Sequence, residues 1–401
     1  MSEISRKLRP FELARWQLER DRERIRRLPL LERKQQRMSV SPFAFLRGAA
    51  PLFYRLLANA PRLTRGPDDE GLLSGDLHLE NFGAYRPDRP SPRGDRVVFD
   101  LNDLDEAFVG HLHLDLLRVL TSVLLAARGW GCTAAGALEL AGEYLDGYRR
   151  ALDSGRSPGV PRPVSALLEQ VAARKRRELL ARRTVGTGNR RRFRIGPTML
   201  RLPRAVRAAC ARAFIRFAKE EIARSGHPPK RFRVLDVAFR VAGTGSLGTF
   251  RVAVLVEGHG PPEGAWMFDL KAMGEPAGLA FATRRTEVGP ERVANALQTM
   301  LRQPPTMLGT VRALGHGLLV RRLTPQEDRL DWTTLPADQR ATTLGYLGAL
   351  TAAAHRRGAR RKPRGPDDAQ ARRILRSATE LAGLHEAVAL AYAAELGRSG
   401  G

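Results

Sequence analysis

The chain has 401 residues, of which 43% are hydrophobic. It is long enough for two or three hydrophobic cores and has the composition of a soluble globular protein. No apolar run reaches the roughly 20 residues that span a bilayer. The first residues also lack the apolar core of a signal peptide, which predicts a cytoplasmic location. Cys132 and Cys210 are the only cysteines, which excludes a disulfide framework and a cysteine-rich zinc site.

The formal net charge is +26, and 61 of the 68 basic residues are Arg. Such a charge attracts polyanions, including nucleic acid and the phosphates of nucleotides. Because Arg is spread along the whole chain, with much Ala, Gly, Leu and Pro, a GC-rich coding bias also accounts for it. Nucleic acid is therefore a partner that the sequence allows but does not favour. With only 7 Lys in the chain, a Lys inside an apolar stretch stands out.

The predicted elements change in character along the chain. The first half predicts a basic amphipathic helix, a short strand, a strand pair across a Pro-rich turn and two apolar helices. These elements cover residues 9–37, 71–74, 82–85 with 96–100, 111–127 and 134–152. The second half predicts a linker, basic helices with a break at Gly186-Thr187-Gly188-Asn189, a β-rich run with one helix, and C-terminal helices. The linker spans 154–163 and the basic helices span 164–226. The strands of the β-rich run are 232–241, 249–257, 266–271 and the pair within 310–323, and its helix is 291–301. The C-terminal helices are 336–357 and 367–396.

These elements predict an α+β fold with five segments. The segments are an N-terminal helical part (1–70), a part with the polar loops (71–160), a basic helical insert (161–230), a β-rich part (231–334) and C-terminal helices (335–401).

The stretch GDLHLENFG and the apolar run that ends in Asp100 carry the first functional pattern. Asp76, Asn81 five residues later, and a second Asp after a short strand form the layout of kinase-type phosphotransferases. One carboxylate receives the proton of the acceptor hydroxyl, while the Asn and the second carboxylate hold Mg²⁺. Asp100 is the first candidate for the second carboxylate, and Asp103 is another. Asp105 and Glu106, in the same acidic run, are further candidate metal carboxylates.

The glycine-rich stretch Gly243-Thr244-Gly245-Ser246-Leu247-Gly248 carries the second pattern. It is followed by alternating β-branched residues rather than by a helix, which indicates a hairpin over phosphates and not a dinucleotide-binding turn. Lys271 ends the next strand, where phosphotransferases place the Lys that holds the α- and β-phosphates. Glu291 is the first candidate for the acidic partner of this Lys, and Glu287 is the second.

The two patterns occur in the reverse of the order usual in kinases. The glycine hairpin and Lys271 follow the Asp76 loop in sequence, which circular permutation explains. The segment 317–323 would then connect the lobes, and the helix 336–357 would precede the catalytic loop in space. Such a rearrangement is physically tolerable where chain ends meet on a surface.

With these residues in hand, the chain resembles the bacterial family called domain of unknown function 2252. The matching stretches are Arg37-Met38 with SPFAFLRG (41–48), GDLHLENFG (75–83), FDLNDLDEA (99–107), RVAGTGSLGTFR (240–251) and DLKAM (269–273). That family is distantly similar to the protein-kinase-like superfamily, which includes aminoglycoside phosphotransferases. The resemblance implies catalysis by Asp76, metal binding by Asn81 and Asp100, and a bracing role for Asp115 at a helix start.

Two further side chains have open roles. His78 either braces the catalytic loop or contacts phosphate, and Arg47 either contacts phosphate or forms a structural ion pair. The expected function is ATP- and Mg²⁺-dependent phosphoryl transfer to the hydroxyl of an unidentified, small acceptor. Two alternatives stay open, namely nucleotidyl transfer on the same fold and a non-catalytic, pseudokinase-like binder of nucleotides or polyanions.

Overall fold

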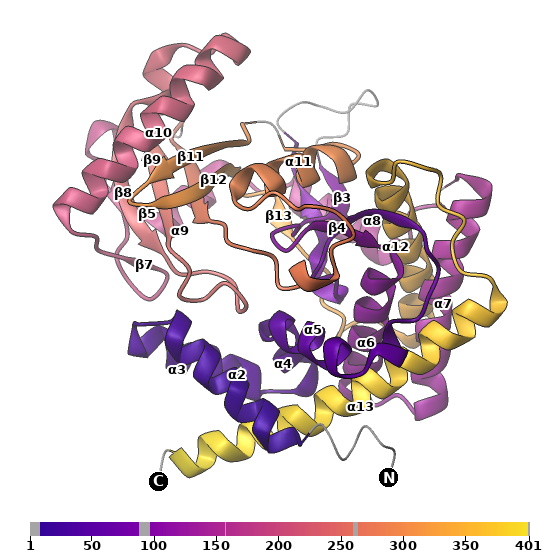
Figure 1. Ribbon diagram of the computed structural model, residues 1–401. Coiled ribbons are helices and arrows are strands. Elements are labelled where there is room, and N and C mark those ends of the chain that lie inside the picture. The colour runs from indigo at the N-terminus through magenta and orange to yellow at the C-terminus, as the bar shows by residue number, and fades with distance from the viewer. Residues whose placement is uncertain (1–8, 88–96, 157, 260–263, 306, 400–401) are drawn as a thin grey trace.

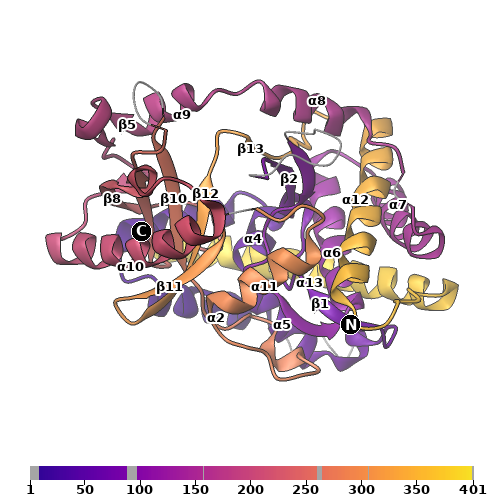
Figure 2. The same cartoon turned by 90° about the horizontal axis from the view of Figure 1, so that it is seen from above.

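The computed structural model of the chain describes residues 9–87, 97–156, 158–259, 264–305 and 307–399. A β-rich part and a helical part lie side by side, and the segment that carries α8 and α9 runs between them (Figures 1 and 2). The mixed helix and sheet content confirms the expected α+β class. The Pro-rich turn and Arg96, at the start of a predicted strand, lie outside the described residues.

The β-rich part is built on an antiparallel sheet with the strand order β11-β12-β10-β9-β8-β7. Its strands are β7 (Met199–Leu200), β8 (Val234–Arg240), β9 (Arg251–Val256), β10 (Trp266–Ala272), β11 (Gly309–Ala313) and β12 (His316–Leu323). Residues Val252–Val256 of β9 and Trp266–Phe268 of β10 are apolar and buried, so both faces of the sheet are covered at these positions. Helix α10 (Arg204–Ser225) covers one face, where Phe214 and Phe217 pack on Phe268.

The helical part is centred on α6 (His113–Gly129), whose side chains from His113 to Ala127 are all buried. A helix that is apolar on every side must be surrounded by protein. Helices α7 (Ala134–Ser154) and α13 (Asp368–Ser399) pack against it, and α12 (Ala337–Gly358) packs against α7. The predicted strand pair 310–323 and the predicted helices 134–152, 336–357 and 367–396 are thus confirmed to within a few residues.

Two small sheets carry the polar loops between these parts. Strand β1 (Glu70–Leu73) pairs with β4 (Phe108–His111), and β2 (Phe82–Tyr85) pairs with β3 (Val98–Leu101). After β12 the chain crosses from the large sheet and forms β13 (Glu327–Asp328), which pairs with β2. The residues between β12 and β13 therefore join the β-rich part to the polar loops.

The N-terminal region differs from its prediction as a single helix. It forms α2 (Pro10–Arg24) and α3 (Leu28–Ser39), because Pro29 lacks an amide proton and belongs in a first helical turn. Helix α2 packs along α13, and Arg15 forms an ion pair with Glu395 at 3.1 Å. The first and last described helices are therefore neighbours.

The basic stretch 164–226 is helical only in part, and its helices are interrupted around the expected break at 186–189. The structure has α8 (Arg162–Ala172), α9 (Arg176–Arg183) and α10, with the strands β5 (Thr184–Val185), β6 (Arg192–Phe193) and β7 between them. Two further helices, α4 (Pro42–Gly48) and α5 (Ala50–Asn59), precede β1. None of the helices in the described part of the chain has the length and apolar character needed to cross a membrane.

Helices α7 and α12 approach closely, and glycine at the contact makes this possible. A Cβ added to Gly147 of α7 would lie 2.1 Å from the carbonyl oxygen of Gly345. Gly142 of the same helix has no neighbour within 4 Å of its added Cβ. We expect Gly147→Ala to destabilise the fold by about 2 kcal/mol or more through overpacking. Gly142→Ala should stabilise it by about 0.5–1 kcal/mol through helix propensity. Urea unfolding measures both, and equal effects would contradict the packing of α7 on α12.

Candidate active site

The loop that carries Asp76 begins with a glycine that no other residue can replace without strain. Gly75 has φ +77°, and a Cβ on it would lie 2.0 Å from the carbonyl oxygen of Glu106. The carbonyl oxygen of Gly75 accepts a hydrogen bond of 2.6 Å from the Tyr54 hydroxyl. The loop therefore leaves β1 in a left-handed conformation that only glycine adopts at low cost.

A buried carboxylate holds the backbone of this loop. Asp115, in the first turn of α6, accepts hydrogen bonds from the amides of Ser74 at 2.7 Å and Gly75 at 3.0 Å. Its Oδ2 also lies 3.2 Å from Nε2 of His355 in α12, and Tyr148 of α7 lies 3.1 Å from the other ring nitrogen. These hydrogen bonds from the Ser74 and Gly75 amides are contacts with the loop backbone, as the family resemblance implied for Asp115. Three helices thus fix one loop.

Arg118 sets the electrostatics of Asp76. The Arg118 side chain is fully buried, and its Nε donates to Oδ1 of Asp76 at 2.6 Å. It also donates to the carbonyl oxygen of Leu46 at 3.0 Å. Burial raises the pKa of Asp76 to about 7, against the lowering effect of the Arg118 charge. A carboxyl with such a pKa exchanges its proton near neutral pH, which suits a general base.

Asn81 and His78, the other polar side chains of this loop, line the same cavity as Asp76. Asn81 donates to the carbonyl oxygen of Asp76 at 3.0 Å. Nδ1 of His78 accepts from the amide of Glu80 at 3.2 Å, and burial with nearby guanidinium groups lowers the pKa of His78 well below its usual value. His78 is therefore a neutral brace of the loop. Arg47 forms an ion pair with Glu80 at 2.7 Å, which is the structural alternative of its two expected roles.

The loop after β3 brings a second set of carboxylates to the site. Asp103 is exposed and accepts a hydrogen bond of 3.2 Å from the amide of Asp105. The carboxylate of Asp105 pairs with Lys271 of β10. Glu106 accepts from the amide of Ala277 at 2.6 Å. Residues far apart in sequence are thereby joined through one short loop.

Lys271 is largely withdrawn from solvent. Its side chain is 13% exposed. Burial lowers its pKa, while the charge of Asp103 acts in the opposite direction. Such a Lys is held ready for a negatively charged partner, and Asp105 supplies one in this structure.

The glycine-rich stretch forms the expected hairpin between β8 and β9. Gly243 and Gly248 both have positive φ, at +80° and +84°. A Cβ on Gly245 would lie 3.3 Å from the carbonyl oxygen of Arg47. The hairpin therefore approaches the backbone of α4 closely, and the N-terminal helices hold it in place. Arg24 donates to the Thr249 hydroxyl at 3.0 Å, and Arg37 donates to the Gly243 carbonyl oxygen at 2.5 Å.

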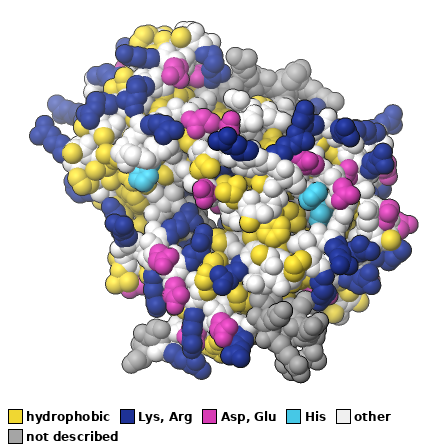
Figure 3. Space-filling model, in the orientation of Figure 1, with side chains coloured by type: hydrophobic (Ala, Val, Ile, Leu, Met, Phe, Trp, Pro, Cys, Tyr) yellow, Lys and Arg dark blue, Asp and Glu magenta, His cyan; other side chains and the backbone are white. Residues whose placement is uncertain are grey.

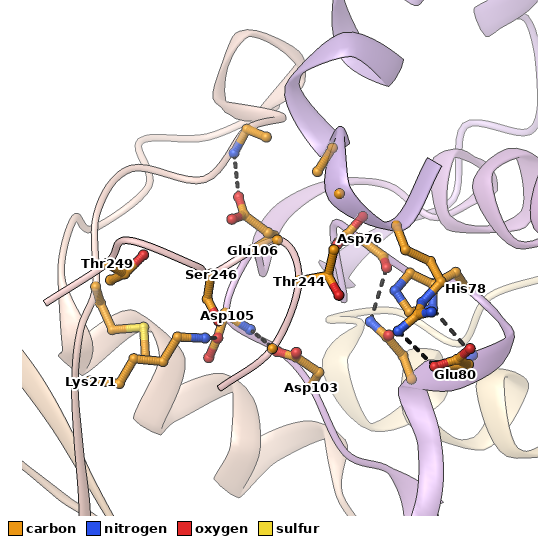
Figure 4. Close-up of a pocket in the computed structure, with 18 of the residues that line it drawn as sticks. Asp76, His78, Glu80, Asp103, Asp105, Glu106, Thr244, Ser246, Thr249 and Lys271 are labelled. Atoms are coloured by element: carbon orange, nitrogen blue, oxygen red, sulfur yellow. Dashed lines mark hydrogen bonds and ion pairs between the residues drawn. The ribbon is translucent and has the colours of Figure 1, made fainter. Parts of the chain in front are cut away.

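These segments line one cleft of about 840 Å³ (Figure 4). In Figure 4, Lys271 and Asp105 approach from one side and Asp76 and His78 lie on the other. The predicted site residues that line the cleft come from the Asp76 loop, the loop after β3, the hairpin, β10 and α4. They are Arg47, Asp76, His78, Asn81, Asp103, Gly243, Thr244, Gly245, Ser246 and Lys271.

Asp100 lies outside the cleft lining, which corrects its place as first metal candidate. Strand geometry turns its side chain away from the cleft. Its carboxylate is buried, accepts hydrogen bonds from the amides of Leu101 at 2.9 Å and Arg302 at 3.1 Å, and lies 3.7 Å from Arg357. Asp103, three residues later, is in the lining instead.

Glu291 and Gly248 also lie elsewhere. Glu291 is an exposed residue in the first turn of α11 (Pro290–Met300) and is not part of the cleft lining. Gly248 packs against Ile25, which lies between α2 and α3. The acidic partner of Lys271 is therefore Asp105, and Gly248 serves the contact with the N-terminal helices.

Two buried arginines were missed in the sequence. Arg118 lies one helical turn after Asp115 on the same face of α6, but its neighbours are all apolar, so only the spacing of three hints at it. Arg292 of α11 donates to the carbonyl oxygens of Asp105 at 2.8 Å and Gly274 at 3.2 Å, and also bonds to that of Ala107. Helix α11 thus orders the loop after β3 through an arginine rather than through a glutamate.

The side chains that line the cleft determine which kind of metal ion would fit there. Within the described ranges no three His, Cys, Asp or Glu side chains are grouped as metal ligands. Asn81 and Asp103 supply hard oxygen donors to the cleft. Mg²⁺ is commonly held by one or two such side chains together with phosphates and water, so the residues present fit Mg²⁺ bound with a phosphate ligand.

The chain matches, over residues 26–398, the sequence profile of a family described as an uncharacterized protein conserved in bacteria (DUF2252). The chain belongs to this family. The match confirms the resemblance seen in the five sequence stretches. No curated protein and no solved structure matches the chain significantly. The description of the family names no activity, so inference about activity rests on the residues of the cleft.

The pKa of Asp76 predicts a pH-dependent stability. Its folded value of about 7 lies above the ordinary 3.8. The contribution of this carboxyl is therefore fully present below pH 4 and is lost as the pH rises through 7, with a slope of at most about 1.4 kcal/mol per pH unit. Asp76→Asn cannot ionise, so its stability relative to wild type should increase between pH 5 and 8 in urea unfolding.

The matched control for this comparison is Asp146→Asn, which removes an exposed carboxylate from α7. Its stability relative to wild type should not vary with pH by more than a few tenths of a kcal/mol. A difference between Asp76→Asn and wild type that stays constant from pH 5 to 8 would show that the pKa of Asp76 is not raised.

Proposed function

We propose that the chain is an ATP- and Mg²⁺-dependent phosphotransferase that acts on a hydroxyl group, with a protein-kinase-like, two-lobed fold in permuted order. One observation carries this proposal. Asp76, Asn81, Asp103, the hairpin at 243–246 and Lys271 line a single cleft, although they come from opposite halves of the sequence. These are the residue types that phosphoryl transfer uses, and their presence in one cleft supports the proposal.

The permuted fold is supported by three connections. The glycine hairpin precedes the strand of Lys271 in one antiparallel sheet, and β12 leads from that sheet to the catalytic loop through β13. In the last turns of helix α12, His355 lies against Asp115 beneath the loop. The neighbouring positions of α2 and α13 suit an exchange of chain order.

Asp76 is the proposed general base. Its carboxylate lines the cleft, and Arg118 fixes one of its oxygens. The second oxygen would accept the proton of the acceptor hydroxyl and orient that hydroxyl for attack. Because Arg118 is anchored by the Leu46 carbonyl oxygen, the base is held in place before any ligand arrives, which reduces the reorganisation that the reaction needs.

Asn81 and Asp103 are the proposed metal ligands. Bound Mg²⁺ would neutralise phosphate charge during transfer. Asn81 is fixed by its bond to the Asp76 carbonyl oxygen, while exposed Asp103 would turn toward a ligand by giving up its hydrogen bond from the Asp105 amide. Lys271 would exchange its contact with Asp105 for the phosphates, and the backbone amides of the hairpin would shield them from water.

Calorimetric titration with ATP, with and without Mg²⁺, tests the binding half of the proposal. We expect Mg²⁺-dependent binding to wild type. Lys271→Ala and Asp103→Asn should each weaken it by about tenfold or more, since each removes a charge-assisted contact worth roughly 1.5–3 kcal/mol.

The controls are Lys219→Ala and Asp146→Asn, which remove the same charges from exposed positions on α10 and α7. Their affinity for ATP should stay within about twofold of wild type, because neither residue lines the cleft. If wild type does not bind ATP, or if the cleft variants bind as the controls do, the nucleotide site is wrong.

Transfer of label from ATP tests the catalytic half. With a bacterial small-molecule extract as the source of acceptors, label from the γ-phosphate should reach a product. Asp76→Asn should lower this turnover by about 10²–10⁴-fold, because it removes the general base, and should retain Mg²⁺-dependent ATP binding.

Two outcomes would replace phosphoryl transfer by the alternatives. Transfer of label from the α-phosphate would indicate nucleotidyl transfer in the same cleft. Binding of ATP by wild type without transfer of either label, and unaffected by Asp76→Asn, would indicate a non-catalytic nucleotide binder.

A further inference from the structure

The positive charge of the chain is concentrated away from the cleft. Residues 161–233 contain 21 Lys and Arg but only 4 Asp and Glu. In the cleft, by contrast, most cationic side chains have an acidic partner, such as Glu80 for Arg47 and Asp269 for Arg251. Figure 3 shows Lys and Arg spread over the visible face, including the end that carries α10. The basic segment therefore needs an explanation that the cleft does not supply.

A second pocket, of about 650 Å³, lies beside this segment. It is enclosed by the start of α9, the C-terminal end of α10, the start of β10 and the residues that follow β12. Its lining includes Lys175 and Arg177, which are both exposed. Glu221 is the acidic side chain among the described lining residues, and Arg224 neutralises it in an ion pair. The pocket thus carries a clear excess of positive charge.

Hydrogen-bond donors in this pocket lack acceptors. Trp266 is 2% exposed, and its indole N–H has no partner among the residues that the structure describes. The buried hydroxyl of Thr324, also in the lining, likewise has none within the described chain. An indole nitrogen only donates, and a buried donor left unpaired costs about 1–3 kcal/mol. A ligand that accepts hydrogen bonds would remove this cost.

Two guanidinium groups near the ring of Trp266 add to the positive charge of the pocket. The guanidinium group of Arg322 lies 4.3 Å from the centre of the indole ring, and that of Arg231 lies 5.9 Å away. His259 meets the ring edge-on at 5.0 Å. Burial, together with nearby guanidinium charges, lowers the pKa of His259. The two guanidinium groups lie close to the same ring, and an anion beside them would offset their mutual repulsion.

We propose that the pocket around Trp266 binds a small, multiply charged anion that carries phosphate or carboxylate groups. The excess of cations supplies the attraction, and Trp266 and Thr324 supply neutral donors that select a ligand rich in acceptors. The site is separate from the cleft, and it does not depend on the proposed phosphotransferase activity.

Calorimetric titration with inorganic pyrophosphate and with citrate tests this site and separates the two sources of negative charge. The double variant Lys175→Gln/Arg177→Gln should weaken binding of the preferred anion about tenfold. The control Arg182→Gln/Lys219→Gln removes the same charge from exposed positions on α9 and α10 outside the pocket, and should weaken it less than threefold. Equal weakening in both would show attraction to the overall charge and would overturn the site.

Two single variants sharpen the result. Trp266→Phe keeps the ring but removes the unpaired donor, so anion affinity should fall about fivefold or more while the unliganded protein keeps or gains stability. A loss of stability with unchanged affinity would overturn the role of the indole. Lys271→Ala should leave the affinity unchanged, and loss of binding in that variant would place the anion in the cleft instead. Absence of binding by wild type at millimolar anion would also refute the proposal.

Discussion

The cleft depends on how the loop 102–107 is tied to the large sheet. Asp105 pairs with Lys271, Glu106 accepts from the amide of Ala277, and Arg292 holds the carbonyl oxygens of Asp105 and Ala107. Each contact joins residues more than 160 positions apart. Because the loop belongs to the same part of the fold as Asp76, these contacts set the separation between Asp76 and the sheet that carries Lys271.

Local sequence patterns were enough to predict elements whose physics is local. The hairpin at 243–248 follows from glycines between β-branched runs, and the buried helix at 113–129 follows from its apolar composition. Pairing of side chains was out of reach, because it depends on tertiary distances. Asp100 and Asp103 both lie at or after an apolar run in sequence. Only the tertiary structure shows that Asp100, within β3, is buried against Arg302 and Arg357, whereas Asp103, in the loop after β3, lines the cleft. Glu291 and Arg292 are adjacent, and only the orientation of α11 turns Arg292 inward.

The distribution of charge shows why net charge alone was a poor guide to partners. The cleft lies in a chain with a net charge of +26, yet acids are prominent in it, and most of its cations are committed to ion pairs. Asp269 illustrates this balance. Although burial acts to raise it, the pKa of Asp269 is held well below its usual value by Arg240 and Arg251. Acidic groups in such a basic protein can favour bound Mg²⁺ locally, whereas the surface potential as a whole favours anions.

The cleft and the Trp266 pocket share one structural element. Successive residues of β12 point to opposite faces of the sheet, so Arg321 lines the cleft and Arg322 lines the pocket. The chain then passes from Thr324 and Gln326, in the pocket, to Glu327 and Asp328, in the cleft. Arg174 fastens this connection through the carbonyl oxygen of Glu327 and the carboxylate of Asp328. Since the same few residues form a wall of each cavity, a change in the position of this segment must alter both.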